Sequence, residues 1–330
     1  MRKLPNVLRL LQFAAVASAA LIFGSPATYS AEAPTIRLAY STAGDEQLWL
    51  LAHRPDLMAK NYGKAYTLEI SRFPSSSKRA QAFAAGALDL EAGGASGEIF
   101  AAAEGEPATI IASVSRQAAN GFRVSWYVMA DSPIKSVADL RGKNVGINGF
   151  STTGHLELLT ALEKNGMTDH DVNIIPVTFP AMQQSLEAGK IDVGYFPQPY
   201  AALLEHETKV RKLFDSRYGM PFDQELIVRA GKDAFLKQHA DAIRAMMEDL
   251  RDATRFYLDK PQIARQALID AKLVRVTPEV YLTMQDYYRD PTLRPDVEAM
   301  EHTQEAMLKA GFQKKPVDIS TIVDAGYLPK

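Results

Sequence analysis

The sequence predicts an α/β protein of two similar lobes, each with a mainly parallel sheet flanked by helices. Three landmarks recur in the same order in both halves of the chain, which indicates a duplicated unit. They are a Ser-Thr-x-Gly loop at 41–44 and 151–154, a Phe-Pro pair, and a nine-residue match between 81–89 (QAFAAGALD) and 184–192 (QSLEAGKID). Because strand and helix patterns alternate along each unit, the sheets should be mainly parallel.

Each unit begins with a strand that leads into a Ser/Thr loop. We expect these strands at 36–40 and 144–148, with a helix starting directly after each loop. A second strand should end at each Phe-Pro pair, Phe73-Pro74 and Phe179-Pro180. An amphipathic helix then stops at a glycine, and an apolar residue and an Asp lead into a third strand.

The apolar strands between and after the repeats predict how the chain is divided. We expect two crossings between lobes, near 118–126 and 217–226. Residues 34–124 would then begin lobe 1, residues 125–224 would form lobe 2, and residues 225–330 would complete lobe 1. The last part has a helical pattern and should cover lobe 1, with helices expected at 234–258, 262–271, 278–288, 297–310 and 319–325.

The first 33 residues have the pattern of a secretory signal peptide. Basic residues precede an apolar run at 13–23, and small residues follow it. The run is shorter than the roughly 20 residues that span a membrane. The chain has no cysteine, so it offers neither a lipid-anchored Cys nor disulfides. We therefore expect export to the periplasm, with cleavage near 30–33.

Composition and motifs favour binding over catalysis. The 37 basic and 39 acidic residues suit no nucleic acid partner. Residues 149–154 have the glycine spacing of a phosphate-binding loop, but His155 and Leu156 stand where Lys and Ser or Thr are required. Six scattered histidines lack metal-ligand spacing. We predict no catalytic residue, metal or cofactor.

The two Ser/Thr loops are the candidate ligand site. Backbone N–H groups at a helix start, together with hydroxyls, bind anions, and strand ends of an α/β fold line its cleft. The alternative is that these residues only cap helices. Arg116 and Arg123 near the first crossing could add a guanidinium, or lie in solvent. The predicted ligand contacts are Ser41, Thr42, Gly94, Ala95, Ser96, Ser151, Thr152, Thr153, Phe196 and Gln198.

Five segments resemble the periplasmic solute-binding proteins of nitrate, sulfonate and taurine ABC importers: 139–148, 151–155, 158–166, 188–192 and 197–200. The resemblance implies the two-lobe, type II-like periplasmic binding protein fold. It also implies a hinge-bending monomer that delivers a small anionic ligand to an inner-membrane ABC permease.

The ligand class remains open between sulfonate and carboxylate. Aliphatic-sulfonate binders often carry Trp-Asp-Pro where this chain has 196–199 (FPQP), which leaves room for an aromatic anion. Two other functions are compatible with the fold. One is an enzyme related to pyrimidine-precursor synthesis, and the other is a ligand sensor for a membrane receptor.

Overall fold

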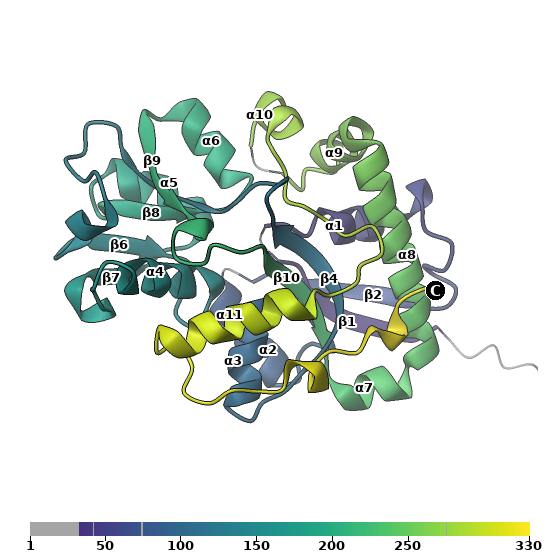
Figure 1. The fold of residues 1–330 in the computed structure, drawn as a ribbon. Helices are drawn as coiled ribbons and strands as arrows, with labels where there is room; N and C mark the ends of the chain where they lie inside the picture. Colours follow the sequence, from purple (N-terminus) through teal and green to yellow (C-terminus); the bar gives the residue numbers. More distant parts are fainter. Residues whose placement is uncertain (1–32, 42, 74, 275) are drawn as a thin grey trace, which may run out of the picture. The chain divides into compact units, whose positions relative to one another are not determined.

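The computed structural model describes residues 33–330 except 42, 74 and 275. The predicted signal peptide therefore lies outside the described residues apart from its last position, and so does Thr42. Within the described part of the chain, ten strands form two five-stranded sheets, each flanked by helices (Figure 1). No helix in this part is long and apolar enough to cross a membrane.

The first sheet has the strand order β2-β1-β3-β10-β4. Strands β1, β2 and β3 pair in parallel, and β10 runs antiparallel to both β3 and β4. The sheet is therefore mixed, with β10 as the one reversed strand. Its strands are β1 (Thr35–Ala39), β2 (Thr67–Ser71), β3 (Leu90–Gly94), β4 (Thr109–Gln117) and β10 (Gln224–Gly231).

The second sheet repeats this plan with the order β7-β6-β8-β5-β9. Strands β6, β7 and β8 pair in parallel, and β5 runs antiparallel to both β8 and β9. The reversed strand of each sheet is the one that follows a crossing from the other sheet. The strands are β5 (Ser125–Met129), β6 (Asn144–Ile147), β7 (Asn173–Pro176), β8 (Val193–Phe196) and β9 (Val210–Asp215).

In each sheet, a helix follows each of the three strands that pair in parallel, as the internal repeat predicts. In the first sheet these helices are α1 (Glu46–His53), α2 (Ser76–Ala84) and α3 (Ala95–Ala103); in the second they are α4 (Thr153–Glu163), α5 (Phe179–Glu187) and α6 (Tyr200–Glu207). One detail of the prediction was wrong. Phe179 and Pro180 begin α5 instead of ending a strand, because proline suits the first turn of a helix.

The C-terminal region is largely helical. Its helices are α7 (Asp233–Gln238), α8 (Ala240–Asp259), α9 (Pro261–Asp270), α10 (Pro278–Thr283) and α11 (Val297–Lys309). Helix α8 packs on α1 and α9, and α11 packs on α3, β10 and α4. The expected helix at 319–325 is replaced by two short 3-10 turns. Among the described residues, the 3-10 turns are Pro55–Leu57, Val137–Leu140, Asp169–Asp171, Ser216–Tyr218, Ile319–Thr321 and Ala325–Tyr327.

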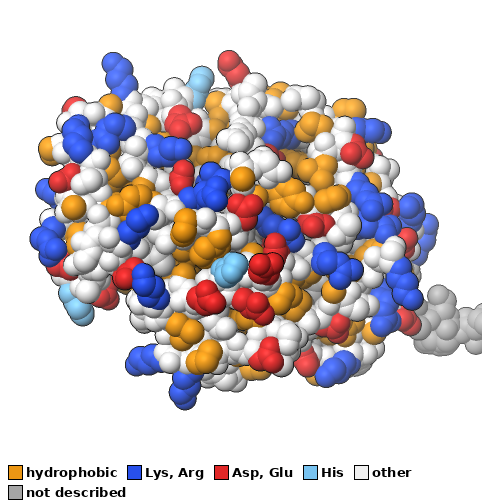
Figure 2. All heavy atoms as spheres, in the orientation of Figure 1, with side chains coloured by type: hydrophobic (Ala, Val, Ile, Leu, Met, Phe, Trp, Pro, Cys, Tyr) orange, Lys and Arg blue, Asp and Glu red, His pale blue; other side chains and the backbone are white. Residues whose placement is uncertain are grey.

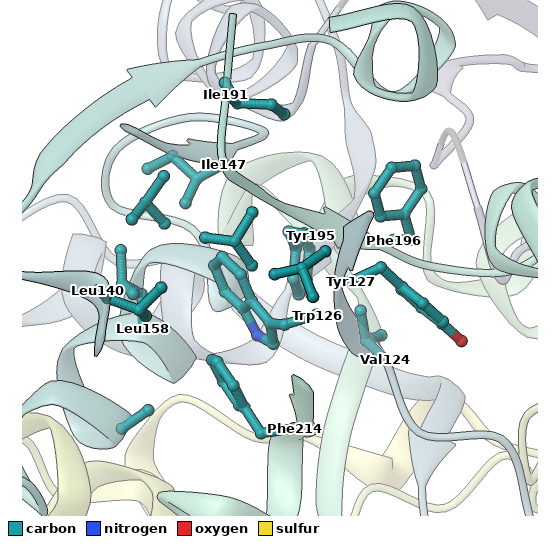
Figure 3. Packing of buried hydrophobic residues seen from close by; sticks show 14 of the residues in the cluster. Val124, Trp126, Tyr127, Leu140, Ile147, Leu158, Ile191, Tyr195, Phe196 and Phe214 are labelled. Carbon is teal, nitrogen blue, oxygen red and sulfur yellow. The ribbon is translucent and has the colours of Figure 1, made fainter. Parts of the chain in front are cut away.

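Each sheet has its own core. Around the second sheet, the fully buried Trp126 stacks on Phe214 at 5.3 Å between ring centroids and lies 5.1 Å from the ring of Tyr195 (Figure 3). Around the first sheet, Met246 and Leu250 of α8 belong to the cluster that buries β1. Each lobe therefore has a hydrophobic core of its own. Full burial of such a side chain contributes about 1.5–3 kcal/mol to stability. The two-lobe α/β prediction is confirmed.

Candidate ligand-binding cleft

Two adjoining cavities lie where the strand ends of the two sheets face each other. We call the first, of about 510 Å³, the aromatic compartment, because Tyr40, Trp49, Phe73, Phe179, Phe196 and Tyr200 line it. We call the second, of about 780 Å³, the hydroxyl compartment, because Ser41, Ser77, Ser151, Thr152 and Thr153 line it. Ser41, Ser75, Ser76, Asn148, Thr178 and Phe179 line both. The compartments therefore form one continuous candidate cleft with walls from both lobes.

The first Ser/Thr loop is tied to a buried carboxylate. The backbone N–H of Ser41 donates to Asp45 Oδ2 at 3.1 Å, and Asp45 Oδ1 accepts from Arg229 Nη2 at 2.7 Å. Both side chains of this ion pair are fully buried. An internal anion thus occupies the start of α1, where the sequence suggested a ligand anion. Ser41 keeps its position in the wall of both compartments.

The second Ser/Thr loop combines capping with lining of the cavity. Thr152 Oγ1 accepts from the backbone N–H of His155 at 3.4 Å and donates to the Gly149 carbonyl at 2.7 Å. Thr152 is therefore the N-cap of α4, which matches the alternative interpretation of this residue. Ser151 has a φ of 55°, a conformation that turns the loop into the helix.

The start of α3 and the second loop meet directly. Ser96 Oγ lies 3.1 Å from Thr153 Oγ1, so each hydroxyl has a partner in the other lobe. A Cβ at Gly94 would lie 2.7 Å from Thr153 Oγ1, so only glycine permits this approach. Ala95 is fully buried and lines neither compartment. These residues hold the two lobes together more directly than they offer free groups to a ligand.

In the turn after β8, Phe196 lines a compartment whereas Gln198 forms hydrogen bonds within the protein. Phe196 lines the aromatic compartment and stands edge-on to Tyr127 at 5.8 Å. Gln198 donates from Nε2 to the Gln285 carbonyl at 3.0 Å, and its Oε1 accepts from the N–H of Ala202 at 3.1 Å. Its backbone N–H donates to the Tyr287 hydroxyl at 2.8 Å. Gln198 lines neither compartment and instead anchors the turn.

Sequence reasoning missed the cation of the aromatic compartment, Arg72. It follows β2 directly, and its guanidinium lies 5.4 Å from the centroid of the Tyr40 ring. Burial raises the pKa of Tyr40 to about 12, and the charge of Arg72 opposes that rise. Arg72 is exposed and, within the described residues, forms no ion pair with a carboxylate. Its position just before the repeated Phe-Pro landmark is a signal that could have pointed to it.

The arginines considered from sequence lie elsewhere. Arg116 donates from Nε to Glu225 Oε1 at 2.8 Å and lies within 4 Å of Asp290 and Asp296. Neither Arg116 nor Arg123 lines a compartment. Arg116 is therefore a structural cation at the end of β4.

A second buried carboxyl connects the first crossing to α4. Gln117 Nε2 donates to Glu157 Oε1 at 2.6 Å, and Gln117 Oε1 accepts from the backbone N–H of Val124 at 2.7 Å. Gln117 ends β4 and Val124 precedes β5, so this network spans the crossing between the sheets. Burial raises the pKa of Glu157 to about 8, which hydrogen bonding from Gln117 only partly offsets.

Charge on the outer surface is mixed. Basic and acidic side chains both spread over the face seen in Figure 2, with hydrophobic side chains between them. This distribution accords with the 37 basic and 39 acidic residues of the chain.

Two α/β lobes around a cleft are a fold that this chain shares with solved structures of different functions. The alkanesulfonate-binding protein SsuA from Xanthomonas axonopodis pv. citri, solved bound to MOPS, has the same fold. The TM-score is 0.71 at 17% identity, over 89% of this chain and 99% of that chain. The desulfurization enzyme DSZB also shares it, with a TM-score of 0.64 at 16% identity, over 89% of this chain and 97% of that chain. The fold alone thus includes both binding proteins and an enzyme.

Sequence comparison places the chain more narrowly. Residues 65–264 match the NMT1/THI5-like family, and the chain belongs to that family. The taurine-binding periplasmic protein of Escherichia coli (strain K12) is 28% identical over 254 residues, which cover 76% of this chain and 75% of that protein. The resemblance to the nitrate, sulfonate and taurine class is thereby confirmed.

Proposed function

We propose that this protein is the periplasmic substrate-binding component of an ABC importer for a small organic anion. It captures a sulfonate or carboxylate between its lobes and delivers it to an inner-membrane permease. Its similarity to a taurine-binding periplasmic protein supports the transport role and the compartment. Closure of two lobes around a ligand provides the change of state that a permease can recognise.

The observation that carries this proposal is the composition of the aromatic compartment. Among the described residues lining it, Arg72 is the one cation and no acidic side chain is present. Hydroxyl and amide groups of Ser75, Asn148 and Gln183 add hydrogen-bond donors. A volume of about 510 Å³ is within the range of small-molecule sites. Beside aromatic rings, a guanidinium that pairs with no carboxylate among the described residues suits an anion with an apolar or ring-shaped body.

We propose that the ligand's acidic group contacts Arg72 and Ser41 while Phe196 covers its apolar body. Ser151 and Thr152 would complete the wall on the side of the second sheet. Thr42, predicted beside Ser41, lies outside the described residues. Ser96, Thr153, Gly94, Ala95 and Gln198 then act by shaping the cleft rather than by holding the charge.

The proposal is tested by isothermal titration with four ligands of one shape: 4-methylbenzenesulfonate, 4-methylbenzoate, 4-methylbenzyl alcohol and 4-methylbenzyltrimethylammonium. We expect the two anions to bind and the cation not to bind. Arg72→Gln should weaken anion binding by roughly tenfold or more, because it removes a charge-assisted hydrogen bond. Arg294→Gln, an exposed arginine outside both compartments, is the matched control. Preference for the alcohol or the cation would refute the proposal.

Transport and sensing separate in cells. Deletion of the gene should abolish uptake of a ligand that binds in vitro, and complementation should restore it. Intact uptake with lost taxis or induction would instead support a sensor.

The chain has no cysteine, and among its described residues no group of His, Asp and Glu could hold a metal ion. Turnover of a bound ligand by the purified protein would favour the enzyme alternative.

A further inference from the structure

The arginine of the aromatic compartment lies against a buried tyrosine. Tyr40 and Arg72 directly follow Ala39 and Ser71, which are partners in the parallel pairing of β1 and β2. The two residues therefore leave the sheet next to each other, and the Arg72 guanidinium lies 5.4 Å from the centroid of the Tyr40 ring. Tyr40 is 8% exposed, whereas Arg72 is exposed. The buried ring thus provides the surface against which the exposed guanidinium rests.

One face of α1 holds the Tyr40 side chain in place. Trp49 and His53 are four residues apart, and side chains at this spacing lie on the same face of a helix. The Trp49 ring meets the Tyr40 ring edge-on at 6.2 Å between centroids, and the His53 ring lies nearly parallel to the Tyr40 ring, at 20°. His53 Nε2 lies 2.5 Å from the Tyr40 hydroxyl oxygen. His53 therefore fixes the hydroxyl, whereas Trp49 packs against the ring.

The protonation states of the pair give this hydrogen bond a direction. Partial burial, and then the charge of Arg72, lower the pKa of His53, so its imidazole is neutral at pH 7 and Nε2 can accept. Burial raises the pKa of Tyr40 to about 12, so its hydroxyl keeps its proton. The charge of Arg72 and a hydrogen bond from Arg72 act against that rise, which places the guanidinium close to the hydroxyl oxygen. The Tyr40 hydroxyl can therefore donate to His53 while its oxygen accepts from Arg72.

Resting on the proposed function, we propose that His53 is a positioning residue for anion binding. By accepting the hydroxyl proton, His53 turns the Tyr40 oxygen toward Arg72. The guanidinium is then held on one side by this oxygen, and its remaining N–H groups face the acidic group of the ligand. His53 lines neither compartment, so it acts through Tyr40 without touching the ligand.

The carboxylate whose charge reaches Tyr40 is already engaged. Asp45 raises the pKa of Tyr40 slightly, after burial and against Arg72, but its Oδ1 accepts from Arg229 Nη2 at 2.7 Å. Among the described residues, no carboxylate forms an ion pair with Arg72. The Tyr40 oxygen is therefore the protein group in place to orient the Arg72 guanidinium.

The test measures binding of 4-methylbenzenesulfonate by isothermal titration. His53→Leu removes the acceptor and should weaken binding about two- to tenfold, as loss of one hydrogen bond predicts. His53→Gln keeps an acceptor oxygen and should retain most of the wild-type affinity. Tyr40→Phe keeps the ring without the hydroxyl and should weaken binding to a similar extent as His53→Leu.

His206→Leu is the matched control, because His206 is also an exposed histidine in the last turn of a helix and lines neither compartment. It should bind the sulfonate as the wild-type protein does. The Arg72→Gln background separates positioning from a general structural effect. There, His53→Leu should cause no further loss, because His53 acts through the guanidinium.

The possible outcomes distinguish this inference from the proposed function. Wild-type affinity in His53→Leu, an equal loss with and without Arg72, or a loss in His53→Gln as large as in His53→Leu would overturn the role of His53 and leave the anion site intact. Unchanged sulfonate affinity in Arg72→Gln itself would overturn the anion site and the inference together.

Discussion

Replacing Glu157 with Gln should remove a large part of the pH dependence of folding stability. Glu157 is 1% exposed, and its folded pKa of about 8 lies above an ordinary value of 4.5. The folded state thus binds this proton more tightly than the unfolded state. The stability that Glu157 contributes is therefore fully present below about pH 4.5 and is lost as pH rises from there to about 8. The full difference corresponds to about 5 kcal/mol, an upper limit, lost at about 1.4 kcal/mol per pH unit in between.

The assay is urea unfolding followed by circular dichroism at intervals from pH 5 to pH 9. Glu157→Gln is neutral at every pH and keeps an oxygen that can accept from Gln117 Nε2. Its unfolding free energy minus that of the wild type should therefore rise from pH 5 to about pH 8 and level off above it. Glu225 and Glu46 have raised pKa values of about 7 and about 6, and their effects cancel in the difference. Parallel pH profiles for the two proteins would refute the reasoning.

Glu163→Gln supplies the control for this measurement. Glu163 ends the same helix, but it is exposed and pairs with Lys309 at 3.0 Å at the surface. Its removal should change stability by less than about 1 kcal/mol, with little effect on the pH profile, because surface ion pairs contribute little. An equally large pH effect from Glu163→Gln would show that the response belongs to total charge and not to the buried site.

Three further predictions concern packing, capping and lobe contact. Trp126→Ala should lower the free energy of unfolding by about 3–5 kcal/mol, because it leaves a cavity where the indole ring stacks on Phe214. A decrease of less than about 1 kcal/mol in urea unfolding would contradict this. Thr152→Ala should lower the free energy of unfolding by about 1 kcal/mol through loss of the α4 cap. Thr152→Ser keeps the capping hydroxyl and should retain most of that stability, as urea unfolding would show. A double-mutant cycle of Ser96→Ala with Thr153→Val should give a coupling of about 0.5–1.5 kcal/mol; additive losses would show that the 3.1 Å contact contributes nothing.

The repeat made the fold predictable because its signals are local. Glycine ends a helix by adopting a positive φ, and Gly86 and Gly189 do so with φ of 78° and 65°. Alternation of strand and helix then favours parallel pairing wherever it occurs. The division of the chain at 124 and 224 stays a prediction at the level of single residues, although the sheets are built from the segments on either side.

The candidate site was less predictable because its chemistry depends on residues far apart in the chain. Sequence patterns suggested an anion at the start of α1, but Arg229 places Asp45 there instead. Likewise, Gln198 looked like a ligand contact until Tyr287 and Gln285 occupied its polar groups.

The sequence by itself determined the duplicated two-lobe fold, the family resemblance and the loops that line the cleft, because propensity, periodicity and motif order are properties of neighbouring residues. Only the tertiary structure decided which polar groups remain free for a ligand. Hydrogen bonding is satisfied in space, so partners such as Arg229 for Asp45 assign the charges. Arg72 became a candidate because no carboxylate among the described residues pairs with it.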